Sequence, residues 1–435
     1  MRKTIYHLLL LTLLPWSTAY GVTATKGIFS VAANKKVQFA NANCVYSDNE
    51  LIQWANLGAV TEEGWDVLTS DEWSYLLADG RTNADDLNAL GTVNGKKGLI
   101  ILPDGWVQPA GIPVYRTVDE AGIGYEYNVY SAEQWSVMAN AGAVFLPCAG
   151  YGYDDDGYHV EDTDDHGAYW AKDQSSVSNA NCIKFNTDGM GGIHDFTNAA
   201  KTNYYSVILV KTVTPTVLDE EDASAAFATK LAAADDYSYA YVARTMKKDG
   251  TLHTLCLPFD VQNIDASPLA GAQVFTFGGG TVSGSTGNEV LHLSLIPLSG
   301  KRLSQGVSYL LRWNNTGDEM ALLCFYHVEN WDNNTSAGAD PGNATVKLHG
   351  VYPKAHIPGY TSGSVAHYNF FMGANNTLYW PDETNYAGSD MKGFRAYFYI
   401  VEQDPDPAPK YRGMQAVWNI EQSATGIEEV QRDHG

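Results

Sequence analysis

The chain has 435 residues, of which 50 are acidic and 27 are basic, so its formal net charge is −23. Hydrophobic residues make up 45% of the sequence, which excludes global disorder, and the shortage of basic residues argues against a nucleic-acid partner, because phosphates are bound by basic patches. At about 150 residues per domain, this length predicts two or three domains.

The first residues have the pattern of a secretory signal. Arg2 and Lys3 precede an apolar stretch, Ile5 to Trp16, that is too short to span a bilayer, and Ala19-Tyr20-Gly21 offers small residues for cleavage. We therefore expect a signal peptide over residues 1–21 and an exported mature chain in the periplasm, at the outer-membrane surface or outside the cell. No membrane span is expected after cleavage; an N-terminal membrane anchor is the alternative.

Residues 22–211 are predicted to form one α+β domain. Two short strands are expected in residues 27–46, followed by two helices that each begin with a capping box. The two boxes are Thr69-Ser70-Asp71-Glu72 and Ser131-Ala132-Glu133-Gln134. Each helix is followed by an apolar strand that ends in Leu-Pro, at residues 98–103 and 143–147. The repeat indicates two similar helix-plus-strand units; chance similarity between short amphipathic helices is the alternative.

The second half has a different pattern. Residues 212–236 combine Thr and Pro, an acidic run and an Ala-rich stretch, and are interpreted as a linker or one short helix. Residues 237–403 alternate short strands with turns such as Lys248-Asp249-Gly250, which is typical of an antiparallel β-sandwich. Residues 404–435 are Pro-rich and then polar, and are predicted to be a flexible C-terminal tail. The fold class expected for the whole chain is mostly β with α+β.

Several runs in the first half resemble a module of exported proteins from gram-negative gut anaerobes. They include Val67 to Leu77, the Gly80-Arg81-Thr82-Asn83 turn, Gly98 to Trp106, and Gly142 to Pro147. The module is similar to the Fibrobacter succinogenes major paralogous domain, and the resemblance covers roughly residues 27–211. It implies a C-type-lectin-like fold related to that of sulfatase-modifying enzymes.

The second half resembles a β-sandwich module that often follows in such proteins. The matching runs are residues 249–260, 309–313 and 392–398. The resemblance implies an exported surface module without an assigned reaction. The reactive cysteine pair of the sulfatase-modifying enzymes is not matched by Cys148 and Cys182, so that oxidase activity is not carried over.

The densest polar segment runs from Tyr153 to Trp170. Clustered carboxylates favour either an open solvated loop or a bound hard cation, and calcium takes six to eight oxygen ligands. The candidate calcium ligands are Asp154, Asp156, Asp162, Asp164 and Asp165. Their spacing does not fit the EF-hand loop, and a solvated acidic hairpin without metal is the alternative. No other cofactor is expected.

Aromatic residues surround the same segment. A flat ring can stack on a sugar face while nearby carboxylates accept hydrogen bonds from the sugar hydroxyls, so this composition predicts a glycan site. The candidate ligand-binding residues are Trp106, Tyr151, Tyr153 and Tyr158, with Trp380 in a second loop. Packing of these rings in the core is the alternative.

The sequence carries no motif that compels catalysis. It lacks GxSxG, HExxH and P-loop patterns, and its five cysteines have no zinc-site spacing. Cys256 and Cys324 lie in apolar runs and are interpreted as small buried residues. We therefore expect a non-catalytic binding protein that recognises a glycan or a surface protein. A structural component of a cell-surface assembly is the first alternative, and a glycoside hydrolase that uses two carboxylates is the second.

Overall fold

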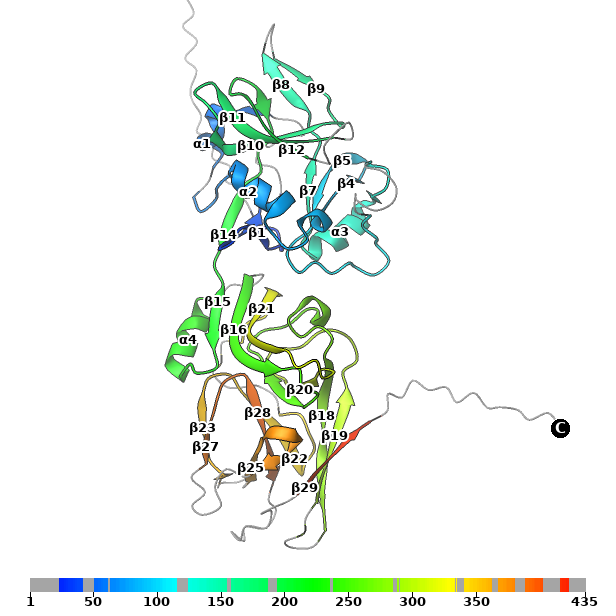
Figure 1. Ribbon diagram of the computed structural model, residues 1–435, viewed down its shortest axis with the longest axis vertical. Coiled ribbons are helices and arrows are strands. Elements are labelled where there is room, and N and C mark those ends of the chain that lie inside the picture. Colours follow the sequence, from blue (N-terminus) through cyan, green and yellow to red (C-terminus); the bar gives the residue numbers. More distant parts are fainter. Residues whose placement is uncertain are drawn as a thin grey trace, which may run out of the picture.

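The computed structural model describes most of the chain after residue 22. The described residues are 23–41, 51–61, 63–115, 124–154, 158–186, 194–234, 238–284, 288, 290–332, 334, 340–361, 367–379, 388–401 and 415–421. They form a mostly β protein in two units that follow one another along the long axis (Figure 1). The predicted signal peptide lies outside the described residues. Among those described, no helix is long and apolar enough to cross a bilayer.

The N-terminal unit contains four small sheets. The first contains β1 (Phe29–Ala32), β2 (Lys35–Phe39) and β14 (Val210–Val213). The second contains β10 (Gly167–Gln174), β11 (Asn179–Phe185) and β12 (Asp195–Ala200). The third contains β3 (Ile52–Gln53), β13 (Tyr204–Tyr205), β8 (Tyr151–Asp154) and β9 (Tyr158–Glu161). The fourth contains β6 (Val129–Tyr130), β4 (Asn88–Val93), β5 (Lys96–Ile101) and β7 (Val144–Pro147).

Both predicted capping boxes are confirmed. In each, the side chain of the capping residue accepts a hydrogen bond from the backbone N–H three residues later, and that later side chain accepts one in return. The helices of this unit are α1 (Leu57–Val60), α2 (Ser70–Ser74), which continues as a π-helical turn (Tyr75–Asp79), and α3 (Ala132–Asn140), with 3-10 turns at Trp54–Asn56 and Ala84–Leu87. The strands predicted to follow the two helices, β5 and β7, pair with each other.

The main core of the N-terminal unit is built on two buried tryptophans. Trp73 lies on the inner face of α2, and Trp170 on β10 stacks on Tyr205 with ring centroids 4.3 Å apart. The indole N–H of Trp170 donates to the carbonyl of Ile52 at 2.8 Å, so its polar edge is satisfied. The ring of Trp73 lies 6.1 Å from that of Phe39 on β2, and the contacts of Trp170 join β10 to the third sheet.

The C-terminal unit is built mainly from strands. Its first sheet contains β15 (Thr216–Asp219), β16 (Ser238–Lys247) and β21 (Glu319–Val328). A second contains β17 (His253–Cys256), β20 (Ser308–Arg312), β18 (Gln273–Ser283), β19 (Val290–Pro297) and β29 (Gln415–Ile420). A third contains β22 (Val346–Val351), β28 (Arg395–Val401), β25 (His367–Met372), β24 (Tyr360–Thr361) and β26 (Leu378–Tyr379), and β23 (Ala355–Ile357) pairs with β27 (Ser389–Met391).

The second and third sheets share one hydrophobic core. Phe277 on β18 meets Phe398 on β28 edge to face at 5.2 Å, and Leu291 and Leu293 on β19 are fully buried in the same cluster. A further helix, α4 (Ser224–Ala232), and 3-10 turns at Ile264–Ala266 and Ala374–Asn376 complete the unit.

The segment interpreted as a linker is structured over most of its length. Strand β15 pairs in parallel with β16, and α4 follows it. Leu218, Phe227 and Leu231 are buried in the core of the C-terminal unit. Residues 216–232 therefore pack as part of that unit, and the connection from β14 to β15 is only Thr214 and Pro215.

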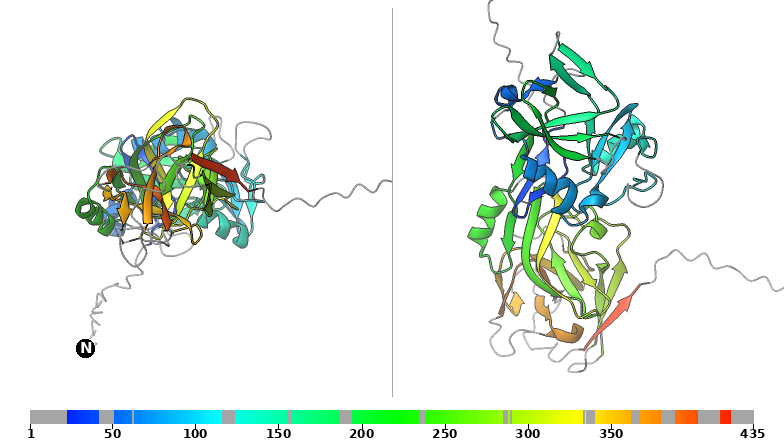
Figure 2. Two further views of the ribbon diagram at one scale, coloured as in Figure 1. Left: turned by 90° about the horizontal axis from the view of Figure 1, so that it is seen from below. Right: turned by 45° about the horizontal axis from the view of Figure 1, so that its top comes forward.

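The prediction of a flexible tail is wrong for residues 415–420. Strand β29 pairs in parallel with β19 at the edge of the second sheet, and the right view of Figure 2 shows it, in red, at the margin of the lower unit. Trp418 packs against Phe398 at 5.7 Å, and its indole N–H donates to the carbonyl of Asn376. Packing of the partly buried Trp418 and Ala416 against the core stabilises a strand that the polar residues around it did not predict. The rest of the predicted tail, apart from Glu421, lies outside the described residues.

A buried polar cluster joins the two units. Asp104, which follows β5, accepts hydrogen bonds from Ser30 at 2.5 Å and from Lys36 at 2.9 Å, and lies 3.5 Å from Arg81. Lys36 also donates to the hydroxyl of Tyr326 on β21 at 3.3 Å, which carries the contact into the C-terminal unit. We call Ser30, Lys36, Arg81, Asp104 and Tyr326 the Asp104 cluster.

The charge of Asp104 is stabilised by its partners. Burial alone would raise the pKa of this carboxyl, but the charge of Lys36, the hydrogen bonds from Ser30 and Lys36, and the charge of Arg81 together hold it below its ordinary value. Lys36 lies 5.1 Å from the ring centroid of Tyr326 and 5.6 Å from that of Tyr239, within cation–π range of both.

We predict that Asp104→Asn lowers the free energy of unfolding at pH 7 by about 3 kcal/mol, because it leaves the buried Arg81 and the partly buried Lys36 without their carboxylate. The matched control is Asp66→Asn, which removes an exposed ion pair with Lys172 and should cost less than about 1 kcal/mol. Chemical denaturation of both variants measures the difference.

The same substitution has an expected pH dependence. Because the pKa of Asp104 is lower folded than unfolded, its stabilising effect is complete above about pH 4 and is lost as pH falls through the folded-state value. The stability gap between wild type and Asp104→Asn should therefore shrink below pH 4. A gap that stays constant down to pH 2 would contradict a charged Asp104.

Candidate functional site

The hairpin of β8 and β9 carries an aromatic and acidic face at the far end of the N-terminal unit (Figure 1). Tyr151 pairs across the hairpin with Glu161, and Tyr153 pairs with His159. Since alternate residues of a strand share a face and paired residues lie side by side, these four side chains lie on one surface. We call Tyr151, Tyr153, His159 and Glu161 the hairpin face.

Glu161 fixes both tyrosines of the hairpin face. Its carboxylate accepts a hydrogen bond from the hydroxyl of Tyr151 at 3.4 Å and another, shorter one from the hydroxyl of Tyr153. The ring of Tyr153 lies 6.1 Å from that of His159. The two phenols are therefore oriented in advance, which reduces the entropy that a ligand must remove on binding.

Tyr151 links the hairpin face to the body of the unit. Its ring meets the edge of His166 at 6.5 Å, and the ammonium of Lys184 lies 5.6 Å from its centroid and 5.4 Å from that of Tyr205. Burial, with the neighbouring charges of Asp162 and Glu161, raises the pKa of Tyr151 to about 12. The phenol is therefore neutral at physiological pH and remains a hydrogen-bond donor.

Two of the candidate calcium ligands have basic partners. Asp162 and Asp165 lie 3.5 and 3.6 Å from Nδ1 of His166, and Asp165 also pairs with Lys97 at 3.2 Å. Asp164 is exposed in the same turn, where its N–H donates to the carbonyl of Cys148. Across the described part of the chain, no three His, Cys, Asp or Glu side chains form a group suited to a metal ion. The side chain of Asp154 and the whole of Asp156 lie outside the described residues, so calcium binding stays a prediction.

The candidate aromatic residues are only partly brought together. Tyr151 and Tyr153 share the hairpin face, whereas Trp106 packs in a separate hydrophobic cluster with Trp135 and Phe145. The backbone of Tyr158 pairs with Asp154 in the hairpin, but its side chain, like the whole of Trp380, lies outside the described residues. The structure thus assembles a smaller aromatic surface than the sequence predicted, and Trp106 is not part of it.

Sequence reasoning missed a cavity between the two units. It has a volume of about 290 Å³ and is bordered by the Asp104 cluster. Its other lining residues are Tyr75, Gly80, Thr82, Leu87 and Gly105. Lys36 and Asp104 are 68 positions apart in the sequence, and Lys36 and Tyr326 are 290 apart, so no local pattern brings them together.

The described cysteines are poor candidates for nucleophilic chemistry. Cys148, Cys182, Cys256 and Cys324 are free thiols, and the first three are buried. Burial is the main cause that raises the thiol pKa of Cys148, Cys182 and Cys256 to about 12, and it also raises that of Cys324. The interpretation as a small buried residue is confirmed for Cys256, while Cys324 is only half-buried. Cys44 lies outside the described residues.

Comparisons with known proteins return no relative. Neither the family models, nor the curated proteins, nor the solved structures include one that matches this chain. Any function assigned to the chain therefore rests on its own sequence and geometry.

We predict that Cys148, Cys182 and Cys256 resist a thiol-specific disulfide reagent in the native protein at pH 8. Each is buried and less than about a thousandth of each thiol is ionised at that pH, since the pKa is about 12. Mass mapping of the labelled peptides, with guanidinium-unfolded protein as the positive control, measures this. Labelling of Cys148 within minutes in the native state would contradict it.

Proposed function

We propose that the chain is an exported, non-catalytic binding protein that recognises a glycan at the hairpin face. The observation that carries the proposal is the fixed pairing of Tyr151 and Tyr153 with Glu161 on one surface of a hairpin at the end of the molecule. Aromatic rings supply an apolar surface for the C–H groups of a sugar, and a carboxylate accepts hydrogen bonds from its hydroxyls.

The charge of the hairpin region favours an uncharged ligand. Glu161, Asp162, Asp164 and Asp165 follow one another closely on and after β9, and Asp154 to Asp156 precede it in the sequence. Such a concentration of carboxylates repels anions, because like charges at short range are unfavourable. Neutral oligosaccharides are therefore preferred to sialylated or sulfated ones.

The proposal extends to the architecture of the two units. We propose a C-type-lectin-like N-terminal domain, supported by its two capped helices among short sheets, and a β-sandwich as C-terminal spacer, supported by two sheets that share one core. Export rests on the signal pattern of residues 1–21.

We predict that Tyr153→Ala weakens binding of a neutral glycan about tenfold, since one stacked aromatic ring contributes about 1–1.5 kcal/mol. The matched control is Tyr115→Ala, which removes an exposed tyrosine of the same unit outside the hairpin. A glycan array identifies the ligand, and calorimetry compares wild type with both variants.

Three results would count against the proposal. Absence of binding across host and plant glycans removes the glycan ligand. An equal loss of glycan affinity in Tyr115→Ala and Tyr153→Ala would exclude the hairpin face as the binding site. Release of products from a polysaccharide, abolished by changing a single carboxylate, would establish the hydrolase alternative instead.

A further inference from the structure

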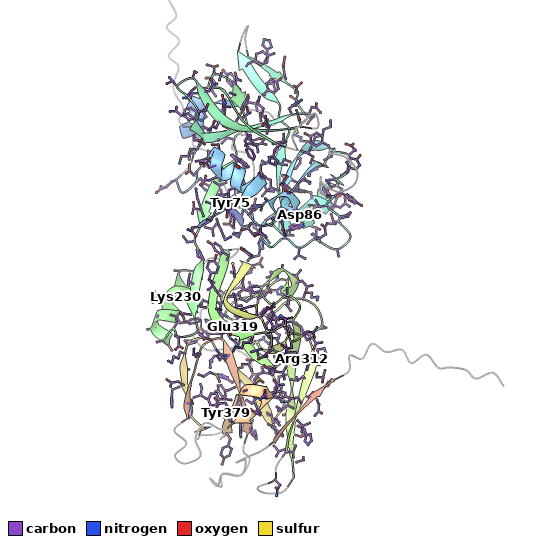
Figure 3. The ribbon with its side chains drawn as sticks, viewed as in Figure 1. Tyr75, Asp86, Lys230, Arg312, Glu319 and Tyr379 are labelled. Carbon is purple, nitrogen blue, oxygen red and sulfur yellow. The ribbon has the colours of Figure 1, made fainter. Side chains whose placement is uncertain are left out.

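The cavity between the units has lining residues whose chemistry differs from that of the hairpin face. Tyr75, Gly80, Arg81 and Thr82 line it from the N-terminal unit, and Tyr326 lines it from the C-terminal unit. Figure 3 labels Tyr75 on the side of the upper unit that faces the lower one. Pockets between two units are frequent ligand sites, and about 290 Å³ lies at the lower end of their usual size.

The charged groups of this cavity do not balance. Lys36 and Arg81 carry two positive charges, and Asp104 carries one negative charge. Arg81 is 7% exposed, and its guanidinium donates to backbone carbonyls of Leu76, Leu102 and Leu87. These carbonyls accept hydrogen bonds from three of its five N–H groups, and in the described part of the chain Asp104 is the one carboxylate that forms an ion pair with it. The surplus cation is notable in a chain with a net charge of −23.

The surplus charge has an energetic cost. Burial lowers the pKa of Arg81 to about 10, and the single carboxylate of Asp104 only partly opposes this effect. A buried charge is stabilised when a partner of opposite sign is supplied, and here the open volume beside the cluster can hold one. The cavity therefore favours a ligand with one negative charge.

The uncharged residues that line the cavity indicate the chemistry of the rest of the ligand. Gly80 lies directly against the ring of Tyr75, since a Cβ added at Gly80 would be 2.0 Å from Cγ of that ring. The rings of Tyr75 and Tyr326 and the side chain of Leu87 provide apolar surface, and Thr82 is an exposed polar residue of the lining. A compact molecule with a carboxylate, C–H faces and hydroxyls fits these walls, and the volume limits it to about a single ring.

We propose that the cavity binds a small sugar acid, a hexuronate or a close analogue, with its carboxylate beside Lys36 and Arg81. Such a ligand supplies the second negative charge of the site and contacts residues of both units. Binding there is separate from recognition of a neutral glycan at the hairpin face.

The test uses the full mature chain with d-glucuronate, d-glucose, acetate and sulfate at matched ionic strength. Calorimetry and the thermal midpoint are expected to report saturable binding of glucuronate, at least tenfold tighter than that of glucose, acetate or sulfate. Thr82→Trp fills the rim of the cavity and should abolish binding, whereas Thr202→Trp, at an exposed turn of the same unit, should leave it unchanged.

Lys36→Met removes a cation of the site and should weaken glucuronate binding at least tenfold. Because this substitution also disrupts the Asp104 cluster, Thr82→Trp remains the deciding variant. The proposal is overturned if glucuronate does not bind, if glucose or the simple anions bind equally well, or if Thr82→Trp binds normally. Retained glucuronate binding in Tyr153→Ala distinguishes this cavity from the hairpin face.

Discussion

The buried carboxylate of Asp104 organises the polar cluster through which Lys36 contacts the C-terminal unit. It is held within the N-terminal unit by Ser30, Lys36 and Arg81, and Lys36 carries the contact on to Tyr326 of the C-terminal unit. Removing two cations and one anion from water costs free energy that is recovered only when their geometry is kept. The charged part of the cluster is therefore fixed within the N-terminal unit, and from there Lys36 donates one hydrogen bond to the C-terminal unit.

The two candidate binding surfaces differ because their electrostatic settings differ. At the hairpin face, the phenols of Tyr151 and Tyr153 lie beside an excess of carboxylates, so neutral polyols are favoured. In the cavity, Lys36 and Arg81 exceed Asp104 by one charge, so an anion is favoured. The two proposed sites, at the end and at the middle of the molecule, would thus have opposite charge preferences in a chain with a strongly negative net charge.

Local features could be predicted from the sequence, and features that depend on chain topology could not. The capping boxes at Thr69 and Ser131 span four residues each and are confirmed, because their hydrogen bonds join near neighbours. The Asp104 cluster joins residues up to 290 positions apart, which no periodicity reveals. Composition alone groups Trp106 with Tyr151, but the fold assigns Trp106 to a different core.

The local sequence also failed to predict strand β29, which is stabilised by the packing of one side chain. The alternation of Ala416, Trp418 and Ile420 is a strand signal, but the Pro-rich run before it and the polar residues after it favour a tail. Packing of Trp418 against Phe398 holds the strand in parallel with β19. Parallel pairing needs a long connection, so sequence proximity gives no hint of the partner.

The two-residue connection between β14 and β15 has a mechanical consequence. Strand β14 is hydrogen-bonded to β2, and strand β15 is hydrogen-bonded to β16. Pro215, which lies between β14 and β15, has a fixed φ and no N–H. A tensile force on one unit would pass almost directly into the sheet of the other, with little slack to absorb it. The molecule would then behave under load as a stiff rod, and the hairpin end would stay at a nearly constant distance from the opposite end.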